Sequence, residues 1–260
     1  LAEGRPGAEA AGLTLSPHLH LFTDLAASAC GTLGGWLFYR RALKPAGYVA
    51  RAQGDLGYWA VLSCAALIGA FWFGTVNLYV TGIEGIGRSA FGALFGGICG
   101  VEIWKALKRQ GGSTGIVYVV PLSLGMILGR IGCQLSGLED FTYGAPTALP
   151  WAWDFGDGIG RHPSPLYESL AMLAFLAGFL LWFRRAPQAV AATGFYVFVG
   201  YYAAQRFLIE FSKPYGALVA GLDVFQIGAL VLLGYALCML WRRRSAQQKE
   251  DGGRVHAARP

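Results

Sequence analysis

The sequence predicts an all-α integral membrane protein with seven transmembrane helices. Of its 260 residues, 55% are hydrophobic and only 14% are charged, whereas soluble domains have about 25% charged residues. A soluble fold could not bury this much apolar surface beneath a charged exterior, so we expect lipid as the solvent. Apolar stretches of roughly the 20 residues that a helix needs to cross a bilayer recur along the chain. Basic residues gather between alternate stretches, as they do in multi-pass proteins.

Seven apolar stretches have the length of a membrane-spanning helix. They lie at about residues 21–39, 56–76, 89–106, 116–135, 165–183, 192–209 and 221–241. The third stretch is rich in glycine, and the fourth and sixth each contain an arginine. These three therefore depart most from a uniformly apolar helix.

The basic residues predict the orientation of these spans. Most of the 21 Lys and Arg residues lie in the loops after the first, third and fifth spans and in the C-terminal tail: Arg40, Arg41, Lys44, Arg51, Lys105, Lys108, Arg109, Arg184, Arg185, Arg242, Arg243, Arg244, Lys249, Arg254 and Arg259. The positive-inside rule then predicts an N-out, C-in topology. Anionic membrane lipid on the inner face accounts for the net charge of +6. No interleaving of basic and aromatic residues suggests nucleic acid.

The segments outside the spans divide the chain further. Residues 1–17, rich in Ala, Gly and Pro, are expected to form a flexible outside lead, and residues 18–244 the membrane domain. Residues 245–260 are polar and predict a disordered inside tail. The longest outside connection, 136–164, contains several aromatic residues, which favours a small packed lid between spans four and five over a linker.

Two arginines at membrane depth are the main functional signal. A lone arginine there costs at least about 2.5–3.5 kcal/mol, so Arg130 and Arg206 must snorkel, pair or line a polar cavity. One interpretation is a structural ion pair, because Glu210 lies one helical turn after Arg206. The other is a site for a lipid phosphate, which guanidinium groups bind through paired hydrogen bonds. Tyr202, one turn before Arg206, lies on the same stripe.

The segment RHPSPLYES (161–169) opens the fifth span. Pro165 suits a first helical turn, and Tyr167 and Glu168 then lie in that turn. For His162 a helix-entry role is the simpler interpretation, whereas an acid at the edge of a span, such as Glu168, needs a partner.

Small residues flank Arg130 in the fourth span and the loop after it. Gly129, Gly132 and Gly137 are typical of close helix packing, and they could equally let a lipid headgroup approach the backbone. The sequence leaves both interpretations open.

The cysteines and histidines show no ligand pattern. The five cysteines are scattered in or beside apolar stretches, where cysteine usually acts as a small hydrophobic residue. The four histidines form no cluster, and no Cys/His spacing suggests zinc. The sequence therefore predicts no disulfide scaffold, no metal and no cofactor.

Five motifs together resemble the bacterial prolipoprotein diacylglyceryl transferase family. They are GRIGCQLSG, YGAPTALPW, RHPSPLYES, YAAQRFLIEFSK and DVFQIG, and their order and spacing match over about residues 20–240. The resemblance implies a multi-pass enzyme of the bacterial inner membrane with its active site facing the periplasm. It implies transfer of a diacylglyceryl group from phosphatidylglycerol to the lipobox cysteine thiol, in the signal-peptide region of a prolipoprotein, with release of glycerol phosphate.

The same resemblance implies site residues. Arg130 and Arg206 match the family's two essential arginines, and Tyr202 and Glu210 match the residues one turn either side of the second. Substrate-binding candidates lie in or beside the motifs: Gly129, Gly132, Cys133, Gln134, Gly144, His162, Tyr167, Glu168 and Gln226. In the implied reaction the arginines hold the phosphate, Glu210 orients Arg206, and Tyr202 could hydrogen-bond a phosphate oxygen. His162 and Glu168 are the candidates for proton handling.

Three departures from the family pattern predict a divergent branch. Cys133 and Ser136 stand where the family often has asparagine, and the third span reads SAFGALFGG (89–97) without the histidine of many members. A thiol has a free pKa of about 8.5, which nearby cations lower, so a general base would be only a modest aid. Two alternatives stay open: a phospholipid enzyme of the same fold with a non-protein acceptor, and a non-catalytic protein that binds or transports anionic lipid.

Overall fold

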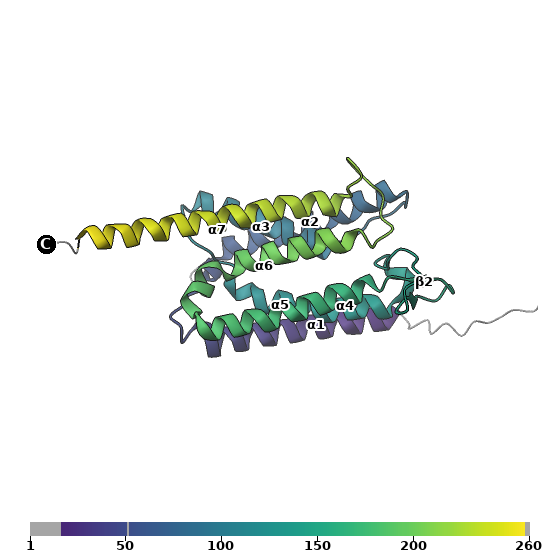
Figure 1. Ribbon diagram of the computed structural model, residues 1–260, viewed down its shortest axis with the longest axis horizontal. Helices are drawn as coiled ribbons and strands as arrows, with labels where there is room; N and C mark the ends of the chain where they lie inside the picture. The colour runs from purple at the N-terminus through teal and green to yellow at the C-terminus, as the bar shows by residue number, and fades with distance from the viewer. Residues whose placement is uncertain (1–16, 51, 258–260) are drawn as a thin grey trace, which may run out of the picture.

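The computed structural model describes residues 17–50 and 52–257. Within them seven α-helices follow one another: α1 (Pro17–Phe38), α2 (Leu56–Thr81), α3 (Ala90–Leu107), α4 (Ile116–Leu135), α5 (Ser164–Arg185), α6 (Pro187–Glu210) and α7 (Val224–Ala257). All seven predicted stretches are therefore helical, and the helices run along the long axis of the molecule (Figure 1). The predicted lead lies outside the described residues, apart from Pro17, which begins α1.

Five of the described helices are long and apolar enough to cross a membrane. These are α2, α3, α4, α5 and the part of α7 up to residue 246. The α6 helix carries Gln205, Arg206 and Glu210 on a buried face, and such polar residues lower its mean hydropathy.

Local sequence signals set the helix ends. The side chains of Asp55 and Ser89 each accept a hydrogen bond from a backbone N–H in the first turn of α2 and α3, as N-cap residues do. Gly82, with a φ of 82°, ends α2 in the left-handed conformation that favours glycine. Pro165 and Pro187 stand in the first turns of α5 and α6, where a missing N–H costs nothing.

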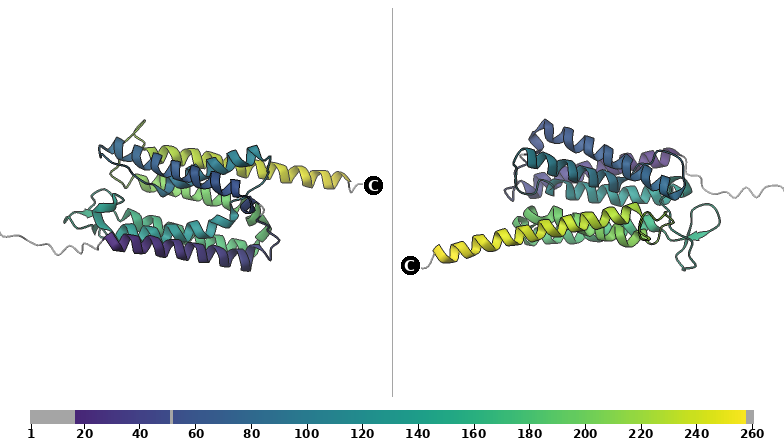
Figure 2. Two further views of the ribbon diagram at one scale, coloured as in Figure 1. Left: turned by 180° about the vertical axis from the view of Figure 1, so that it is seen from behind. Right: turned by 90° about the horizontal axis from the view of Figure 1, so that it is seen from above.

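The helices form two groups that α6 joins. One group contains α1, α4 and α5, and the other contains α2, α3, α6 and α7 (Figure 2, left). The α2 and α3 backbones approach so closely that a Cβ at Gly69 would overlap the carbonyl of Gly92. The glycine-rich third span is thus a packing surface of small residues, and this explains its departure from a uniformly apolar helix.

The connection between α4 and α5 is folded. It contains a 3-10 turn, Gly137–Asp140, and an antiparallel pair of short strands, β1 (Trp153–Asp154) and β2 (Gly160–Arg161), in which Trp153 is opposite Arg161. Figure 1 shows this segment at one end of the bundle, beside the start of α1. We call this end the lid end.

The C-terminal segment differs from the prediction. The sequence predicts disorder from residue 245, whereas α7 continues to Ala257 and extends well past the other helices (Figure 1). Residues such as Ala246 and Gln248 have high helix propensity, so they can extend a helix that the membrane segment has already nucleated.

Candidate functional site

Three charged residues from different helices lie at the same depth near the lid end. Arg130 is near the C-terminal end of α4, Arg206 is near the C-terminal end of α6, and Glu168 is in the second turn of α5. Each is within about two turns of the helix end, or about 10 Å at the rise of an α-helix. The helical framework therefore brings together residues that are distant in sequence.

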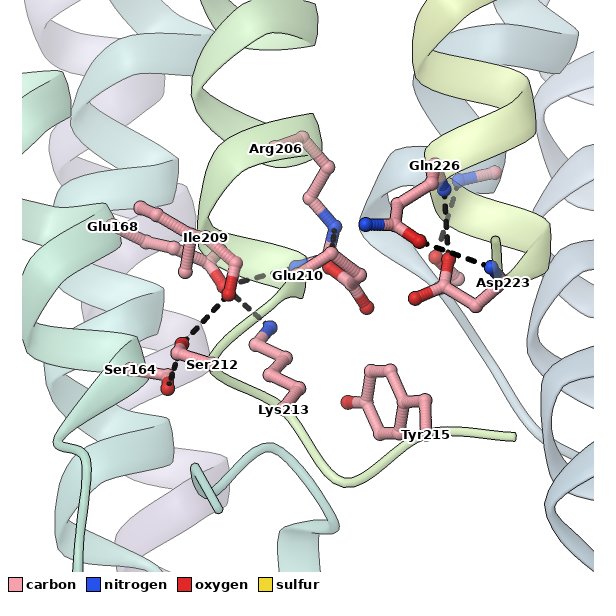
Figure 3. A network of polar contacts seen from close by, with 12 residues as sticks. Ser164, Glu168, Arg206, Ile209, Glu210, Ser212, Lys213, Tyr215, Asp223 and Gln226 are labelled. Carbon is pink, nitrogen blue, oxygen red and sulfur yellow. Dashed lines mark hydrogen bonds and ion pairs between the residues drawn. The ribbon is translucent and has the colours of Figure 1, made fainter. Parts of the chain in front are cut away.

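Glu168 is the centre of this arrangement. Its Oε2 lies 2.6 Å from Nε of Arg130, and its Oε1 lies 2.9 Å from Nη1 of Arg206 and 2.5 Å from Nζ of Lys213. The Glu168 side chain is only 3% exposed. Three cations thus meet on one buried carboxylate, which provides the partner that the sequence requires for Glu168 and for both arginines. Figure 3 shows Glu168 with two of them, Arg206 and Lys213.

Arg206 is enclosed on several sides. Its Nη2 donates a 3.3 Å hydrogen bond to Oε1 of Glu210, and its Nε lies 3.0 Å from Oε2 of the same carboxylate without hydrogen-bond alignment. The guanidinium carbon also lies 4.6 Å from the ring centroid of Phe225, a cation–π contact. The predicted ion pair between Arg206 and Glu210 is therefore present, within a larger network.

Arg130 is more open than Arg206. The Arg130 side chain is 15% exposed, against 4% for Arg206. Its Nε contacts Glu168, and its Nη1 lies 3.9 Å from Sγ of Cys133. Of the two arginines, Arg130 is therefore the more accessible.

Lys213 is a site residue that the sequence argument did not identify. It lies in the loop after α6, and its side chain is fully buried against Glu168. A 2.7 Å hydrogen bond between the hydroxyls of Ser164 and Ser212 fastens this loop to the start of α5 (Figure 3). The sequence signal that could have identified Lys213 is its position as the last residue of the motif YAAQRFLIEFSK. It is one of the few basic residues that lie outside the predicted inside loops and tail. Burial and, secondarily, the charge of Arg206 lower the pKa of the Lys213 amine.

The cluster has an excess of positive charge. We define it as Arg130, Glu168, Arg206, Glu210 and Lys213, whose formal charges sum to +1. The carboxyl of Asp223, at the start of α7, also interacts electrostatically with Arg206 and Lys213. Among residues 17–50 and 52–257, no group of His, Cys, Asp or Glu side chains has the arrangement of a metal site.

Tyr202 and Gln226 lie close to the cluster in supporting positions. Tyr202 is 2% exposed and lies one helical turn before Arg206 on α6. Its ring is stacked on that of Phe198. Gln226 and Asp223 form a reciprocal cap at the start of α7, with hydrogen bonds of 2.7 and 3.1 Å. Burial raises the pKa of the Asp223 carboxyl. Figure 3 shows this cap facing the Arg206 and Glu210 side chains.

His162, Tyr167 and Gly144 form a separate group at the base of the lid. Nδ1 of His162 lies 3.5 Å from the hydroxyl of Tyr167, which accepts a 2.7 Å hydrogen bond from the indole of Trp151. The N–H of Gly144 donates to the carbonyl of His162, and a Cβ at Gly144 would overlap that carbonyl. These contacts connect the lid to the start of α5, rather than to the cluster.

The small and polar residues near Arg130 differ in their surroundings. Gly132 faces Thr23 of α1 so closely that a Cβ would overlap it, which supports the helix-packing interpretation at this position. At Gly129 a Cβ would meet no described atom within 4 Å. Gln134 is 6% exposed, and neither its amide nitrogen nor its amide oxygen has a hydrogen-bond partner among the described residues.

Comparison with known proteins covers nearly the whole described chain. The family model for prolipoprotein diacylglyceryl transferase matches residues 21–242. A relative named phosphatidylglycerol–prolipoprotein diacylglyceryl transferase, from Nitratidesulfovibrio vulgaris, is 31% identical over 232 residues, which is 83% of this chain and 86% of the relative. A protein of the same name from Pseudoalteromonas translucida is 28% identical over 231 residues, with 82% and 85% covered. One from Bordetella parapertussis is 36% identical over 148 residues, with 54% and 55% covered.

No solved structure matches the chain. The family match nevertheless includes all five residues of the cluster and all but the ends of α1 and α7. The chain therefore belongs to the prolipoprotein diacylglyceryl transferase family.

Proposed function

We propose that this multi-pass membrane protein transfers a diacylglyceryl group from phosphatidylglycerol to the lipobox cysteine thiol of a prolipoprotein. Its relatives are named for phosphatidylglycerol and prolipoprotein. The observation that carries the proposal is the buried cluster around Glu168, with its one uncompensated positive charge. A phosphodiester carries one negative charge, so phosphatidylglycerol has the charge that this cluster accepts.

The two arginines have different roles in this proposal. Arg130, with the more exposed guanidinium, contacts the phosphate of the donor lipid. Arg206 is held by Glu168 and Glu210 and is a positioning residue that keeps positive potential beneath the phosphate. Such fixed charge stabilises a developing anion without reorganisation during the reaction.

The reaction forms one bond and breaks one. The cysteine sulfur attacks the diacylglyceryl carbon that bears the phosphate, a C–S bond forms, and the C–O bond to the phosphate breaks. The electron pair leaves on the oxygen of glycerol phosphate, where the cluster stabilises it. The proton of the thiol ends on this phosphate monoester, whose second pKa is about 6, or in solvent. Cationic neighbours also favour the thiolate, which suits a chain without the third-span histidine.

The proposed topology is seven spans, N-out and C-in, with the lid end facing the periplasm of a bacterial inner membrane. The basic residues of the loops after α1, α3 and α5 support it, because these loops lie at the end opposite the lid. The position of residues 136–164, between α4 and α5 at this end of the bundle, supports a lid here. The low hydropathy of α6 is compatible with a span, since its buried polar residues face protein rather than lipid.

Transfer can be tested with the full chain in nanodiscs that contain phosphatidylglycerol, with a lipobox peptide added. The proposal expects both release of glycerol phosphate and a lipid-modified peptide. Release without peptide modification would indicate a non-protein acceptor, and lipid binding without release would indicate a binding or transport protein. Lys108→Ala is a suitable control, because Lys108 is an exposed cation at the opposite end of the bundle.

A further inference from the structure

Gln134 has a buried amide for which no described residue is a hydrogen-bond partner. The residue is 6% exposed, and both Nε2 and Oε1 lack a partner among the described residues. An amide that loses water without gaining a hydrogen bond is unfavourable. The buried amide of Gln134 is therefore a candidate group for recognising a ligand.

The position of Gln134 relative to Arg130 indicates what it would recognise. The two residues are four apart on α4, so their side chains lie on the same helix face. Gln134 is next to the last residue of the helix, Leu135, and is thus one turn closer to the lid end than Arg130. A lipid whose phosphate reaches Arg130, with its acyl chains in the membrane, would direct its terminal headgroup toward Gln134.

We infer that Gln134 selects the donor lipid by hydrogen bonding to a hydroxyl of its headgroup. This inference rests on the proposed function and adds a selectivity residue to it. An amide offers both an acceptor oxygen and donor N–H groups, which match a hydroxyl that both donates and accepts. An ammonium headgroup only donates, and it would bring a second positive charge to a cluster that already has an excess. The chemistry therefore favours a neutral polyol headgroup.

The test compares two lipids that share the phosphodiester. One is phosphatidylglycerol, and the other is a phosphatidylpropanol with the same acyl chains but without headgroup hydroxyls. Transfer rates and competitive lipid binding are measured for the full chain in nanodiscs, for Gln134→Leu and for Gln134→Met. The methionine variant keeps an unbranched side chain, so it reports on the site if the leucine variant does not fold.

A matched control is available at the other end of the bundle. Gln53 is also a partly buried amide, and its Nε2 donates a 2.8 Å hydrogen bond to the carbonyl of Thr114. Gln53→Leu removes an amide of the same kind far from the cluster. It is expected to leave the preference between the two lipids unchanged.

We expect the wild-type chain to prefer phosphatidylglycerol about tenfold or more, as the loss of one hydrogen bond to a buried group predicts. In a Gln134 variant that folds, this ratio should fall to near one, chiefly through weaker use of phosphatidylglycerol. An unchanged ratio, no preference in the wild type, or an effect confined to the KM of the peptide would overturn the inference. Lipid binding with the expected preference but without transfer would contradict the proposed function and leave the role of Gln134 intact.

Discussion

Two charge clusters among the described residues of the bundle are built differently. The cluster at the lid end takes its members from α4, α5, α6 and a loop, and it has one positive charge in excess. The second cluster lies near the C-terminal end of α3, away from the lid end. There Lys105 binds both oxygens of Glu102 at 2.8 and 3.0 Å, and Tyr235 of α7 donates a 2.7 Å hydrogen bond to the same carboxylate.

The difference is the one expected between a structural ion pair and the proposed anion site. Glu102 and Lys105 are three residues apart on one helix and balance each other, so their pairing limits the cost of a charge in an apolar bundle. The cluster around Glu168 is unbalanced and is assembled from distant segments. Buried charge in excess does not stabilise a fold, so its retention requires another reason, and anion binding supplies one.

Removal of the central carboxylate should have the largest effect. Glu168→Gln leaves three buried cations around a neutral side chain, and we expect a loss of about 3–5 kcal/mol in unfolding free energy together with the loss of transfer. Thermal unfolding in detergent measures the first effect. Glu102→Gln is the comparison, and its effect should be smaller, because the Glu102 side chain is 30% exposed and faces one cation. Equal destabilisation would remove the distinction between the two clusters.

Arg130→Ala should reduce transfer by about 10²–10³-fold, the cost of removing one charge-stabilising donor. Stability should change little, because Glu168 keeps Arg206 and Lys213 as partners. Initial rates of peptide modification and the unfolding midpoint are measured on the same preparation. Activity within a few-fold of wild type would contradict the contact between Arg130 and the phosphate.

Lys213 should make donor binding sensitive to alkaline pH. Because burial lowers its pKa, Lys213 loses its proton below the ordinary range of lysine, about 10.4, and the cluster then loses its excess charge. The KM for phosphatidylglycerol should therefore rise with pH, and Lys213→Arg, which stays charged, should flatten the profile.

The lowered pKa of Lys213 has a different effect on folding. The unfolded state binds the proton more tightly than the folded state, so the contribution of Lys213 to the free energy of unfolding rises with pH. Identical alkaline profiles would exclude Lys213 as the titrating group.

Replacement of the second pair should have the smallest effect. The double change Glu102→Gln with Lys105→Met removes both charges, and we expect transfer within about twofold and an unfolding midpoint within a few degrees, since neutral replacement of a buried pair is often tolerated. Lys105→Met alone should destabilise more, because it leaves Glu102 without its cation. A double variant with less transfer than either single variant would indicate that this pair also serves the reaction.

The sequence by itself determined the seven helices and identified the two arginines at membrane depth. Both depend on local properties: the length of an apolar stretch decides a span, and an arginine at membrane depth is expensive wherever it occurs. The same locality explains the difference at the C-terminal end, where polar composition predicts disorder and helix propensity allows α7 to continue to Ala257.

Only the tertiary structure decided which groups meet. Glu168 is 38 residues from Arg206 and 45 from Lys213, and no periodicity connects them, because the rotation of each helix about its axis depends on how its neighbours pack. His162 and Tyr167 lie only a few residues from Glu168, yet they turn to the lid and to Trp151. Composition and spacing can identify a charge that needs a partner, but the identity of that partner depends on packing across the whole bundle.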